Sequence, residues 1–387
     1  MPSPRFSSRL SWNLPTNRLS LRIAERRAAG PSFVDLTESN PTVCGLAADA
    51  ADLRTALASA EGAERYVPDP RGLASARAVL AAREGGEPDD YLLTASTSEA
   101  YALLFKLLAD PGDVVLAPRP SYPLFDHLAA LEGLTLAHYP LVREDDWRID
   151  RAALTALLDS TPRARAILVV SPNHPTGSFL HPEDHAALAA LAERHGLAVV
   201  VDEVFARYGV DGAPGEPAEE PVLTFRLGGL SKSAGLPQLK LGWIRAGGPP
   251  ALRREALARL ELVADAYLSL ATPVQLALPA LLALGDTVCA RILARVVANR
   301  ATLVARVAGP AVAAAGVSLL PSPAGWSAVL RFPSVATDED LALAALDRGV
   351  LVQPGYFFDL DGGTFLVVSL LPAPDAFARG LDALFAG

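Results

Sequence analysis

The chain has 387 residues, of which 51% are apolar and 20% are charged, and its formal net charge is −9. This balance excludes wholesale disorder, and the negative charge gives no electrostatic basis for binding nucleic acid. No apolar run approaches the roughly 18 residues of a membrane span, and the two cysteines, Cys44 and Cys289, lack the spacing of a disulfide scaffold or a zinc cluster.

The N-terminal segment is basic: its first 30 residues carry six arginines and one glutamate. No apolar segment of the kind found in secretory signals follows these charges. Transit peptides rich in Arg and Ser have a similar composition, so that interpretation stays open. We favour a basic arm that lies on an acidic body, and we expect a cytoplasmic protein that binds neither nucleic acid nor membrane.

From residue 90 onward, short apolar segments alternate with longer segments of helical period. The predicted strands are Leu92–Leu93, Val114–Pro118, Leu134–His138, Ala166–Val170, Leu197–Val201, Leu223–Leu227 and Gly242–Ala246, and helices are predicted at Ser98–Leu108, Ser121–Leu131 and Glu183–His195. This alternation predicts an α/β domain with a mostly parallel central sheet flanked by helices. Sheets of this kind bind ligands at the carboxyl ends of their strands.

The pattern changes after about residue 250. Helices are predicted at Pro250–Leu270 and Pro273–Val307, and strands at Val317–Leu320, Trp326–Phe332 and Phe365–Leu370. These strands predict a smaller α+β domain, and we assign the apolar stripes of the two helices to the core. We expect a large domain at residues 45–285, with residues 1–44 and 286–387 forming the N-terminal arm and the small domain.

Lysine is rare in this chain: only Lys106, Lys232 and Lys240 accompany its arginines. Lysine can lose its proton and attack a carbonyl group, which arginine cannot do. Lys232 and Lys240 lie in Gly228–Trp243, a glycine-rich segment that follows a predicted strand. Partial desolvation there would lower the pKa of a lysine and free its amine for Schiff-base chemistry. For a lysine taken alone, a solvated surface position is the alternative.

Three further polar groups follow predicted strands. Asp202 lies 30 residues before Lys232; alone it suits a helix cap or a metal ligand, but beside a Schiff-base lysine it suggests the anion that keeps a pyridine nitrogen protonated. The segment Ser171–Gly177 follows another strand. Thr94–Ala100 joins a strand to a helix, where hydroxyls and backbone N–H groups suit a phosphate or serve only as a helix cap.

These strand-end groups, in this order, resemble class I/II aminotransferases of the pyridoxal-phosphate fold type I, and the resemblance covers nearly the whole chain. Other segments that agree are Glu38–Thr42, Arg65–Leu73, Asp110–Asp113, Pro118–Pro123 and Gly349–Gly355. The resemblance implies an enzyme that uses pyridoxal 5′-phosphate. Such an enzyme transfers an amino group between an amino compound, the donor, and a 2-oxo acid, the acceptor.

The resemblance also implies roles for single residues. Lys232 would form the Schiff base and move the substrate proton, Asp202 would keep the ring nitrogen protonated, and Tyr122 would stack on the ring. The other cofactor contacts that it implies are Ser96, Thr97, Ser98, His174, Ser231 and Lys240. Tyr66 would reach the phosphate of the neighbouring subunit, which implies a homodimer with shared active sites.

Four positions depart from the pattern of the family. His174 stands in the slot of an asparagine that donates to the phenolic oxygen of the cofactor, and Phe205 in the slot of a tyrosine that is a second donor. Gly229 replaces a serine. Lys240 replaces a phosphate-binding arginine. A lysine keeps the positive charge but cannot donate the two parallel hydrogen bonds of a guanidinium group.

A fifth departure concerns the substrate. Val367 occupies the slot of the arginine that clamps the substrate α-carboxylate. Either the substrate has no carboxylate there or another arginine binds it, and Arg18, Arg22 and Arg331 are the candidates.

Two other functions stay open. A carbon–sulfur β-lyase or a related lyase would use the same fold, because the cofactor supplies the carbanion chemistry. A non-catalytic protein that binds pyridoxal phosphate is the third possibility, and the retention of both Lys232 and Asp202 argues against it.

Overall fold

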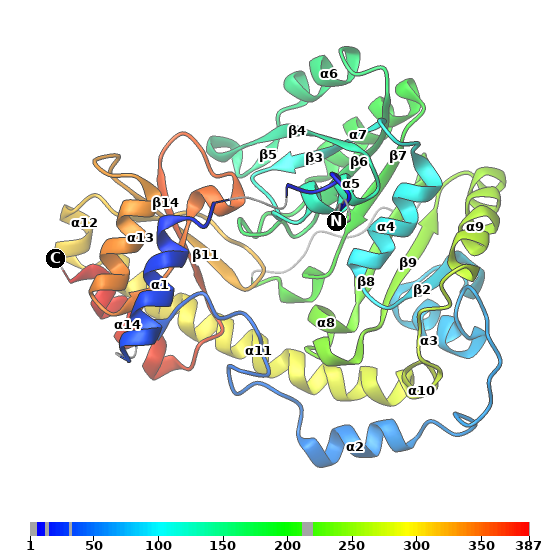
Figure 1. Ribbon diagram of the computed structural model, residues 1–387, viewed down its shortest axis with the longest axis horizontal. Helices are drawn as coiled ribbons and strands as arrows, with labels where there is room; N and C mark the ends of the chain where they lie inside the picture. Colours follow the sequence, from blue (N-terminus) through cyan, green and yellow to red (C-terminus); the bar gives the residue numbers. More distant parts are fainter. Residues whose placement is uncertain (1–5, 12–14, 31–32, 211–219, 387) are drawn as a thin grey trace, which may run out of the picture.

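An eight-stranded sheet forms the centre of the larger part of the molecule, within the residues that the structure describes (Figure 1). The structure is a computed structural model, and it describes residues 6–11, 15–30, 33–210 and 220–386. The strands follow the order β2-β9-β8-β7-β6-β3-β4-β5 across the sheet. Their bounds are β2 Tyr91–Thr94, β3 Val114–Arg119, β4 Thr135–Val142, β5 Arg148–Ile149, β6 Ala164–Val170, β7 Ala198–Asp202, β8 Thr224–Gly229 and β9 Gly242–Gly247.

Strands β8, β7, β6, β3 and β4 run parallel to one another, whereas β9 and β5 run antiparallel to their neighbours. The predicted, mostly parallel sheet is thus confirmed. The parallel strands are continuous apolar runs because helices cover both faces of the sheet, as at Val199–Val201, which is buried throughout. Successive residues of a strand point to opposite faces of the sheet. In β3, Val115 packs against the helices on one face and Leu116 against those on the other.

Two layers of helices cover the faces of this sheet. Helices α4, α5 and α9 pack on one face, α6 and α7 pack on the other, and α3, α8 and the start of α11 pack around β2 and β9. Within the described residues, no helix has the length and the apolar character that a membrane span requires. The bounds are α2 Ala50–Ala58, α3 Ala74–Glu84, α4 Thr97–Leu108, α5 Phe125–Leu131, α6 Arg151–Asp159, α7 Pro182–His195, α8 Leu230–Ser233, α9 Pro250–Asp265, α10 Thr272–Leu276 and α11 Leu278–Val307.

A smaller unit carries an antiparallel sheet of strand order β10-β11-β14-β13, as the predicted α+β domain requires. Helix α11 runs from the larger part into this unit, because Leu278 packs near the large sheet and Leu303 packs in the core of the small unit (Figure 1). The expected boundary at residue 285 falls inside α11, so the division into 45–285 and the remainder stays a prediction. The other elements are α1 Arg18–Ala29, β1 Val34–Asp35, β10 Ser318–Leu319, β11 Ser327–Phe332, α12 Pro310–Ala314, α13 Asp338–Asp347, β12 Val350–Leu351, β13 Gln353–Pro354, β14 Thr364–Ser369, α14 Pro374–Phe385 and the short 3₁₀ turns η1 Pro88–Asp90, η2 Arg143–Asp145, η3 Ala206–Tyr208, η4 Pro237–Leu239 and η5 Gly355–Phe358.

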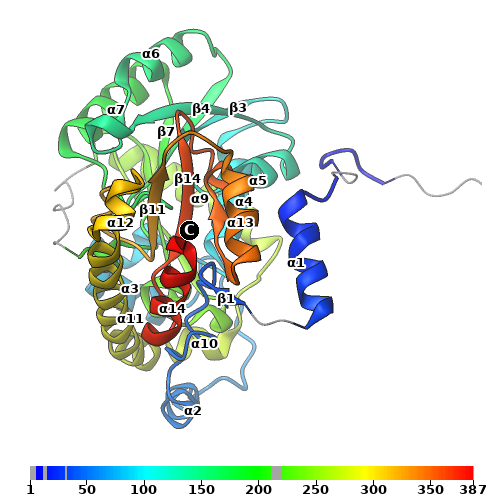
Figure 2. The ribbon, with the colours of Figure 1, turned by 90° about the vertical axis from the view of Figure 1, so that its left-hand side faces the viewer.

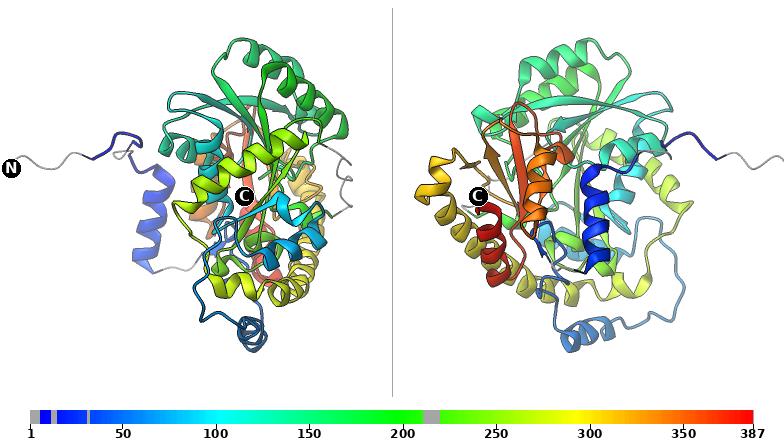
Figure 3. Two further views of the ribbon diagram at one scale, coloured as in Figure 1. Left: turned by 90° about the vertical axis from the view of Figure 1, so that its right-hand side faces the viewer. Right: turned by 60° about the vertical axis from the view of Figure 1, so that its left-hand side comes forward.

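The N-terminal helix α1 lies on the outside of the small unit, beside α13 (Figures 2 and 3). Arg18 pairs with Asp340 at 2.9 Å, and Arg22 pairs with Asp347 at 2.8 Å. This arrangement agrees with the expectation of a basic arm on an acidic body. Residues 1–5 and 12–14 of that arm lie outside the described residues.

Strand β9 brings the ends of β2 and β8 to one place. Thr94 of β2 and Gly229 of β8 both pair with Gly242 of β9. A Cβ atom at Gly242 would lie 3.1 Å from the Thr94 hydroxyl oxygen and 3.1 Å from the carbonyl carbon of Ser96, so this close approach favours glycine. The polar segments that follow β2 and β8 therefore meet at the same edge of the sheet.

Candidate active site

A cavity of about 420 Å³ lies where β2, β6, β7 and β8 end. Most of its wall comes from the segments that follow these strands, and Trp326 and Ser327 add a wall from the small unit. The carboxyl ends of the parallel strands lie at one edge of the sheet, which is why segments so far apart in the sequence line one cavity. All the site residues predicted from the sequence line it except Tyr66.

Part of the lining combines hydroxyl groups, a helix N-terminus and a lysine: Ser96, Thr97, Ser98, Ser231 and Lys240. Ser96 caps α4, since its Oγ accepts a hydrogen bond of 3.1 Å from the backbone N–H of Glu99. The cap does not exclude the phosphate role, because the first N–H groups of a 12-residue helix and its dipole still attract an anion.

Asp202 is a buried carboxylate at the end of β7, with 6% of its surface exposed. Its Oδ1 accepts a 3.0 Å hydrogen bond from the backbone N–H of Val204, and its Oδ2 accepts a 3.0 Å bond from the hydroxyl of Tyr101. Burial raises the pKa of Asp202 to about 6, although both hydrogen bonds and the charge of Lys232 act in the opposite direction. A buried carboxylate of this kind favours a cationic ligand.

Lys232 lies on the one-turn helix α8 and is half-buried. Its Nζ lies 4.9 Å from the ring centroid of Trp326 and 5.9 Å from that of Phe205. Burial lowers the pKa of Lys232, and the charge of Asp202 raises it by a smaller amount. This environment differs from the solvated surface position that was the alternative, and it makes the amine a better nucleophile.

His174 follows β6 and stacks on Phe205, with ring centroids 5.9 Å apart and planes inclined by 25°. Phe358 approaches the same imidazole edge-on at 5.1 Å. Burial, with the charge of Lys232 as the smaller cause, lowers the pKa of His174 to about 4. The imidazole is therefore neutral at neutral pH and can donate from one ring nitrogen.

The neighbouring Asn173 does not line the cavity. It is buried and donates 3.0 Å hydrogen bonds to the carbonyl oxygen of Pro120 and to the hydroxyl of Thr176, while the hydroxyl of Ser121 donates to its Oδ1. These contacts use both ends of its amide. Asn173 thus holds the loop after β6 in place, and His174 is the side chain that this loop presents to the cavity.

Tyr122 and Tyr66, the two tyrosines predicted to contact the cofactor, lie in different parts of the molecule. Tyr122 lines the cavity with 37% of its surface exposed, and its ring packs edge-on against Phe125. Tyr66 is 79% exposed and lines a separate, smaller hollow beside Tyr267. Within the described chain Tyr66 therefore has no part in the cavity.

No arginine among the described residues lines the cavity. Val367 is buried in an apolar cluster with Trp147 and Phe358, outside the lining. Arg18 and Arg22 pair with α13, and Arg331 lies on the exposed part of β11. The structure thus brings none of the three candidate arginines to the cavity.

Two lining residues carry chemistry that the sequence analysis did not assign. Trp326 directly precedes β11 of the small unit, and no periodic signal places a residue of one domain in the cavity of another. Tyr101 lies four residues after Thr97 on α4, so it shares a helix face with the residues predicted to bind phosphate. The four-residue spacing from Thr97 is the sequence signal from which the position of Tyr101 could have been predicted.

The donor set fits the cofactor that the resemblance implies. Pyridoxal 5′-phosphate needs an anion-binding group, an acid for its ring nitrogen and a primary amine for its aldehyde. The N-terminus of α4 with Lys240, the buried Asp202 and the half-buried Lys232 supply these three within one cavity.

Comparisons with known proteins agree with this assignment of chemistry. The chain matches the model of the family described as "Aminotransferase class I and II" over residues 32–375. It is 30% identical to nicotianamine aminotransferase B of Hordeum vulgare over 284 residues, which is 68% of this chain and 50% of that one. It is 33% identical to S-alkyl-thiohydroximate lyase SUR1 of Arabidopsis thaliana over 206 residues, which is 51% of this chain and 44% of that one.

The structure superposes on alanine aminotransferase from Pyrococcus furiosus with a TM-score of 0.86, covering 98% of each chain at 24% sequence identity. At that identity the likeness shows the shared fold. The chain spans about half the length of the two curated relatives named above. Because the family match extends over most of the sequence, the chain belongs to the class I and II aminotransferase family.

Proposed function

We propose that this chain is an aminotransferase that uses pyridoxal 5′-phosphate, the cofactor of its family, to transfer an amino group from an amino compound to a 2-oxo acid. One observation carries the proposal: a half-buried lysine and a buried aspartate share a cavity, close enough for the charge of Asp202 to raise the pKa of Lys232. The family match gives this pair its chemical context.

When bound, the cofactor supplies an electron sink that stabilises negative charge at the reacting carbon of the substrate. The amine of Lys232 would hold the cofactor through its aldehyde, and Nζ would carry the proton that leaves the substrate carbon. The carboxylate of Asp202 keeps a proton on the ring nitrogen, and the bond from Tyr101 holds that carboxylate in place. The ring of Trp326, whose centroid lies 4.9 Å from Nζ, covers one side of the amine.

The remaining lining residues bind and orient the cofactor. The hydroxyls of Ser96, Thr97, Ser98 and Ser231, with Lys240 and the N-terminus of α4, hold the phosphate. Tyr122 would stack on one face of the ring, and the neutral His174 would donate to the phenolic oxygen. The presence of all these side chains in the lining of one cavity supports these roles.

A homodimer is part of this proposal. Tyr66, Val67, Tyr267 and Leu268 are large apolar side chains that are exposed around one hollow, and such a patch favours a protein contact. A second copy that covers it would bring Tyr66 to the phosphate of the other cavity. Sedimentation of wild type and of Tyr267→Glu distinguishes a dimer, which this substitution weakens, from a monomer, which it leaves unchanged.

We place the protein in the cytoplasm. Cys44 and Cys289 are both free thiols, and free cysteines are typical of reducing compartments. Staining of the tagged chain in its own cells tests this placement.

A lyase is the second candidate, and one observation favours it: a relative that is 33% identical is named a lyase. The same carbanion leads to loss of a sulfur group when the substrate carries one on its β-carbon. The two candidates therefore differ in substrate and product rather than in the residues of the cavity.

The experiment that tests the function uses the holoenzyme and single amino compounds. Transamination converts the bound cofactor to its amine form and releases the matching carbonyl compound, which a 2-oxo acid then reverses. Release of pyruvate and ammonia from an S-alkyl cysteine indicates a lyase. Lys232→Ala is the control, and conversion that survives this substitution would contradict the assignment of Lys232.

A further inference from the structure

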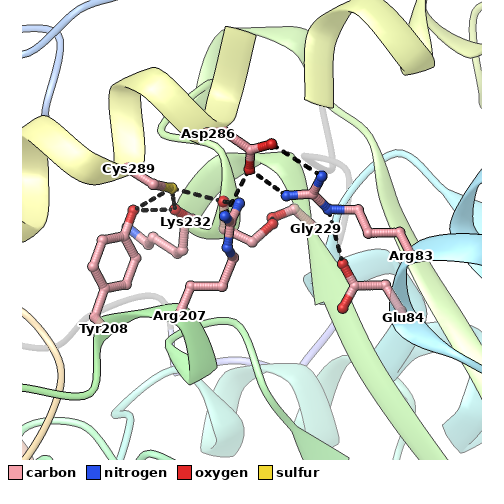
Figure 4. A network of polar contacts seen from close by, with 9 residues as sticks. Arg83, Glu84, Arg207, Tyr208, Gly229, Lys232, Asp286 and Cys289 are labelled. Carbon is pink, nitrogen blue, oxygen red and sulfur yellow. Dashed lines mark hydrogen bonds and ion pairs between the residues drawn. The ribbon is translucent and has the colours of Figure 1, made fainter. Parts of the chain in front are cut away.

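The end of the helix that carries Lys232 is held by side chains from two other elements (Figure 4). Helix α8 has only four residues, and at its end the backbone N–H of Gly235 donates a 3.2 Å hydrogen bond to the carbonyl oxygen of Lys232. Side chains supply further donors to the last carbonyl groups. The hydroxyl of Tyr208 donates a 2.6 Å hydrogen bond to the carbonyl oxygen of Lys232. The thiol of Cys289 donates to the carbonyl oxygen of Ser233 at 2.7 Å, and it lies 3.1 Å from the Tyr208 hydroxyl.

A second set of contacts connects these donors to the long helix α11. Arg207 donates to the same carbonyl oxygen of Ser233 at 3.0 Å and pairs with Asp286 at 2.6 Å. Asp286 also pairs with Arg83 of α3. Asp286 and Cys289 lie three residues apart on α11 and so share one face of that helix (Figure 4). Helix α11 is thereby joined to the end of α8.

Both donors are held in a fixed position and keep their protons. Tyr208 is fully buried, and its ring packs edge-on against Trp326 at 5.0 Å. Burial raises the pKa of the Tyr208 hydroxyl and the pKa of the Cys289 thiol, so each remains a donor at neutral pH. Tyr208 thus contacts both the backbone of Lys232 and the tryptophan that lies nearest to its Nζ.

We propose that Tyr208 and Cys289 are positioning residues, which fix the amine of Lys232 in the cavity by holding the two carbonyl groups at the end of α8. The proposal rests on the function proposed above for Lys232. Neither side chain lines the cavity, so neither touches the substrate. They act by keeping the backbone of Lys232 where its side chain meets the wall formed by Trp326.

The variants are chosen to separate positioning from ordinary stability. Tyr208→Phe removes the hydroxyl and keeps the ring. Tyr139→Phe is the matched control, because the Tyr139 hydroxyl is buried and donates a 2.7 Å bond to the carbonyl oxygen of Leu168, away from the cavity. Cys289→Ser keeps a donor at its position, whereas Cys289→Ala removes it.

The first readout is the titration of Lys232 in the cofactor-free protein, because in the holoenzyme this amine would be bound to the cofactor aldehyde. The full chain contains three lysines, so reductive methylation with ¹³C-formaldehyde gives a simple NMR spectrum in which Lys232→Arg identifies the signal. In wild type we expect Lys232 to titrate below the ordinary lysine pKa of 10.5. In Tyr208→Phe the released side chain becomes more solvated, so its pKa rises toward that value, while Tyr139→Phe leaves it unchanged.

The second readout is steady-state kinetics of the holoenzyme. Tyr208→Phe and Cys289→Ala should lower kcat by about tenfold with little change in KM, because a misplaced reacting group slows chemistry more than binding. Cys289→Ser should recover most of the loss. Tyr139→Phe should lose as much thermal stability as Tyr208→Phe and keep its kcat.

One result overturns the proposal: Tyr208→Phe loses stability as Tyr139→Phe does but keeps the wild-type kcat and the wild-type titration of Lys232. Tyr208 would then be a structural residue only. A separate result bears on the function: if Lys232→Arg retains activity, Lys232 is not the reacting amine. In that case the pKa of Lys232, compared between wild type and Tyr208→Phe, still decides whether Tyr208 positions this side chain.

Discussion

The hydroxyl of Tyr101 donates a 3.0 Å hydrogen bond to the Oδ2 atom of Asp202, joining helix α4 to the end of strand β7. In the function proposed above, the helix whose N-terminus would bind the phosphate therefore also orients the acid that would serve the ring nitrogen. Tyr101 follows Thr97 by four residues, so the two side chains lie about one helical turn apart along α4. This spacing lets one rigid element place both groups.

Replacing the acid should abolish most of the activity. Asp202→Asn keeps the size of the side chain but removes the negative charge that holds a proton on the ring nitrogen, so the electron sink weakens. We expect kcat to fall below about a tenth of wild type, which corresponds to more than about 1.4 kcal/mol in the barrier. Retention of a larger fraction of kcat in a folded Asp202→Asn protein would show that this carboxylate does not serve the ring.

The same substitution should stabilise the cofactor-free protein at high pH. The pKa of Asp202 is about 6 in the folded chain, above the ordinary value of 3.8, so the folded state binds this proton more tightly than the unfolded state. The contribution to stability is therefore greatest below pH 3.8 and is lost as pH rises to about 6, where the buried charge costs up to about 3 kcal/mol. Thermal unfolding of wild type and Asp202→Asn should differ at pH 8 and converge at pH 4.

A hydroxyl at position 205 should change the titration of the bound cofactor. Phe205 stacks on His174 and offers no hydrogen bond to the phenolic oxygen. In Phe205→Tyr a new donor would stabilise the phenolate, so the visible absorption of the holoenzyme should titrate at lower pH than in wild type. Phe125→Tyr adds a hydroxyl elsewhere in the lining and should not move the midpoint. Equal midpoints in wild type and Phe205→Tyr would place Phe205 away from the phenolic oxygen.

A new cation in the lining should improve the binding of carboxylates. The described residues of the lining offer two cations, and the proposed function engages both, Lys232 with the aldehyde and Lys240 with the phosphate. A substrate carboxylate then lacks an ionic partner, which weakens its binding. Ser39 lines the cavity without being fully buried, so Ser39→Arg should lower KM for aspartate and for 2-oxo acids by about tenfold, roughly the effect of one charge-assisted contact.

The control for that variant is Val43→Arg, which adds the same charge at a residue that is 64% exposed outside the lining. It should leave KM unchanged. A wild-type enzyme that already has a low KM for aspartate, unaffected by Ser39→Arg, would mean that another cation binds the carboxylate.

The sequence predicts the central sheet well because each buried strand is a short apolar run bounded by turns. The predicted strand Leu197–Val201 corresponds to the observed strand Ala198–Asp202. The predicted strand Gly242–Ala246 corresponds to the observed strand Gly242–Gly247. The strand-end rule also predicts that Asp202 and Lys232 meet, since both follow neighbouring strands of one sheet. Local patterns are sufficient for these features.

Features that depend on distant packing were not predictable in this way. The expected helix Pro250–Leu270 ends at Asp265. Leu268, three residues further on, adopts a left-handed conformation with φ of 44°, which no hydrophobic period signals. The role of Trp326 depends on how the small unit packs against the sheet. The contact between Tyr208 and Cys289 joins positions 81 residues apart, and neither residue type indicates it.

The most direct measurement of the central claim is the site of cofactor attachment. Reduction of the holoenzyme with borohydride, followed by peptide mapping, should place the pyridoxyl group on Lys232, because burial lowers the pKa of this amine within a cavity suited to the cofactor. Lys106 pairs with Glu132 outside the cavity, and Lys240 is exposed at its edge. A label confined to Lys232 is the predicted result, and a label on Lys106 or Lys240 in its place would contradict this account.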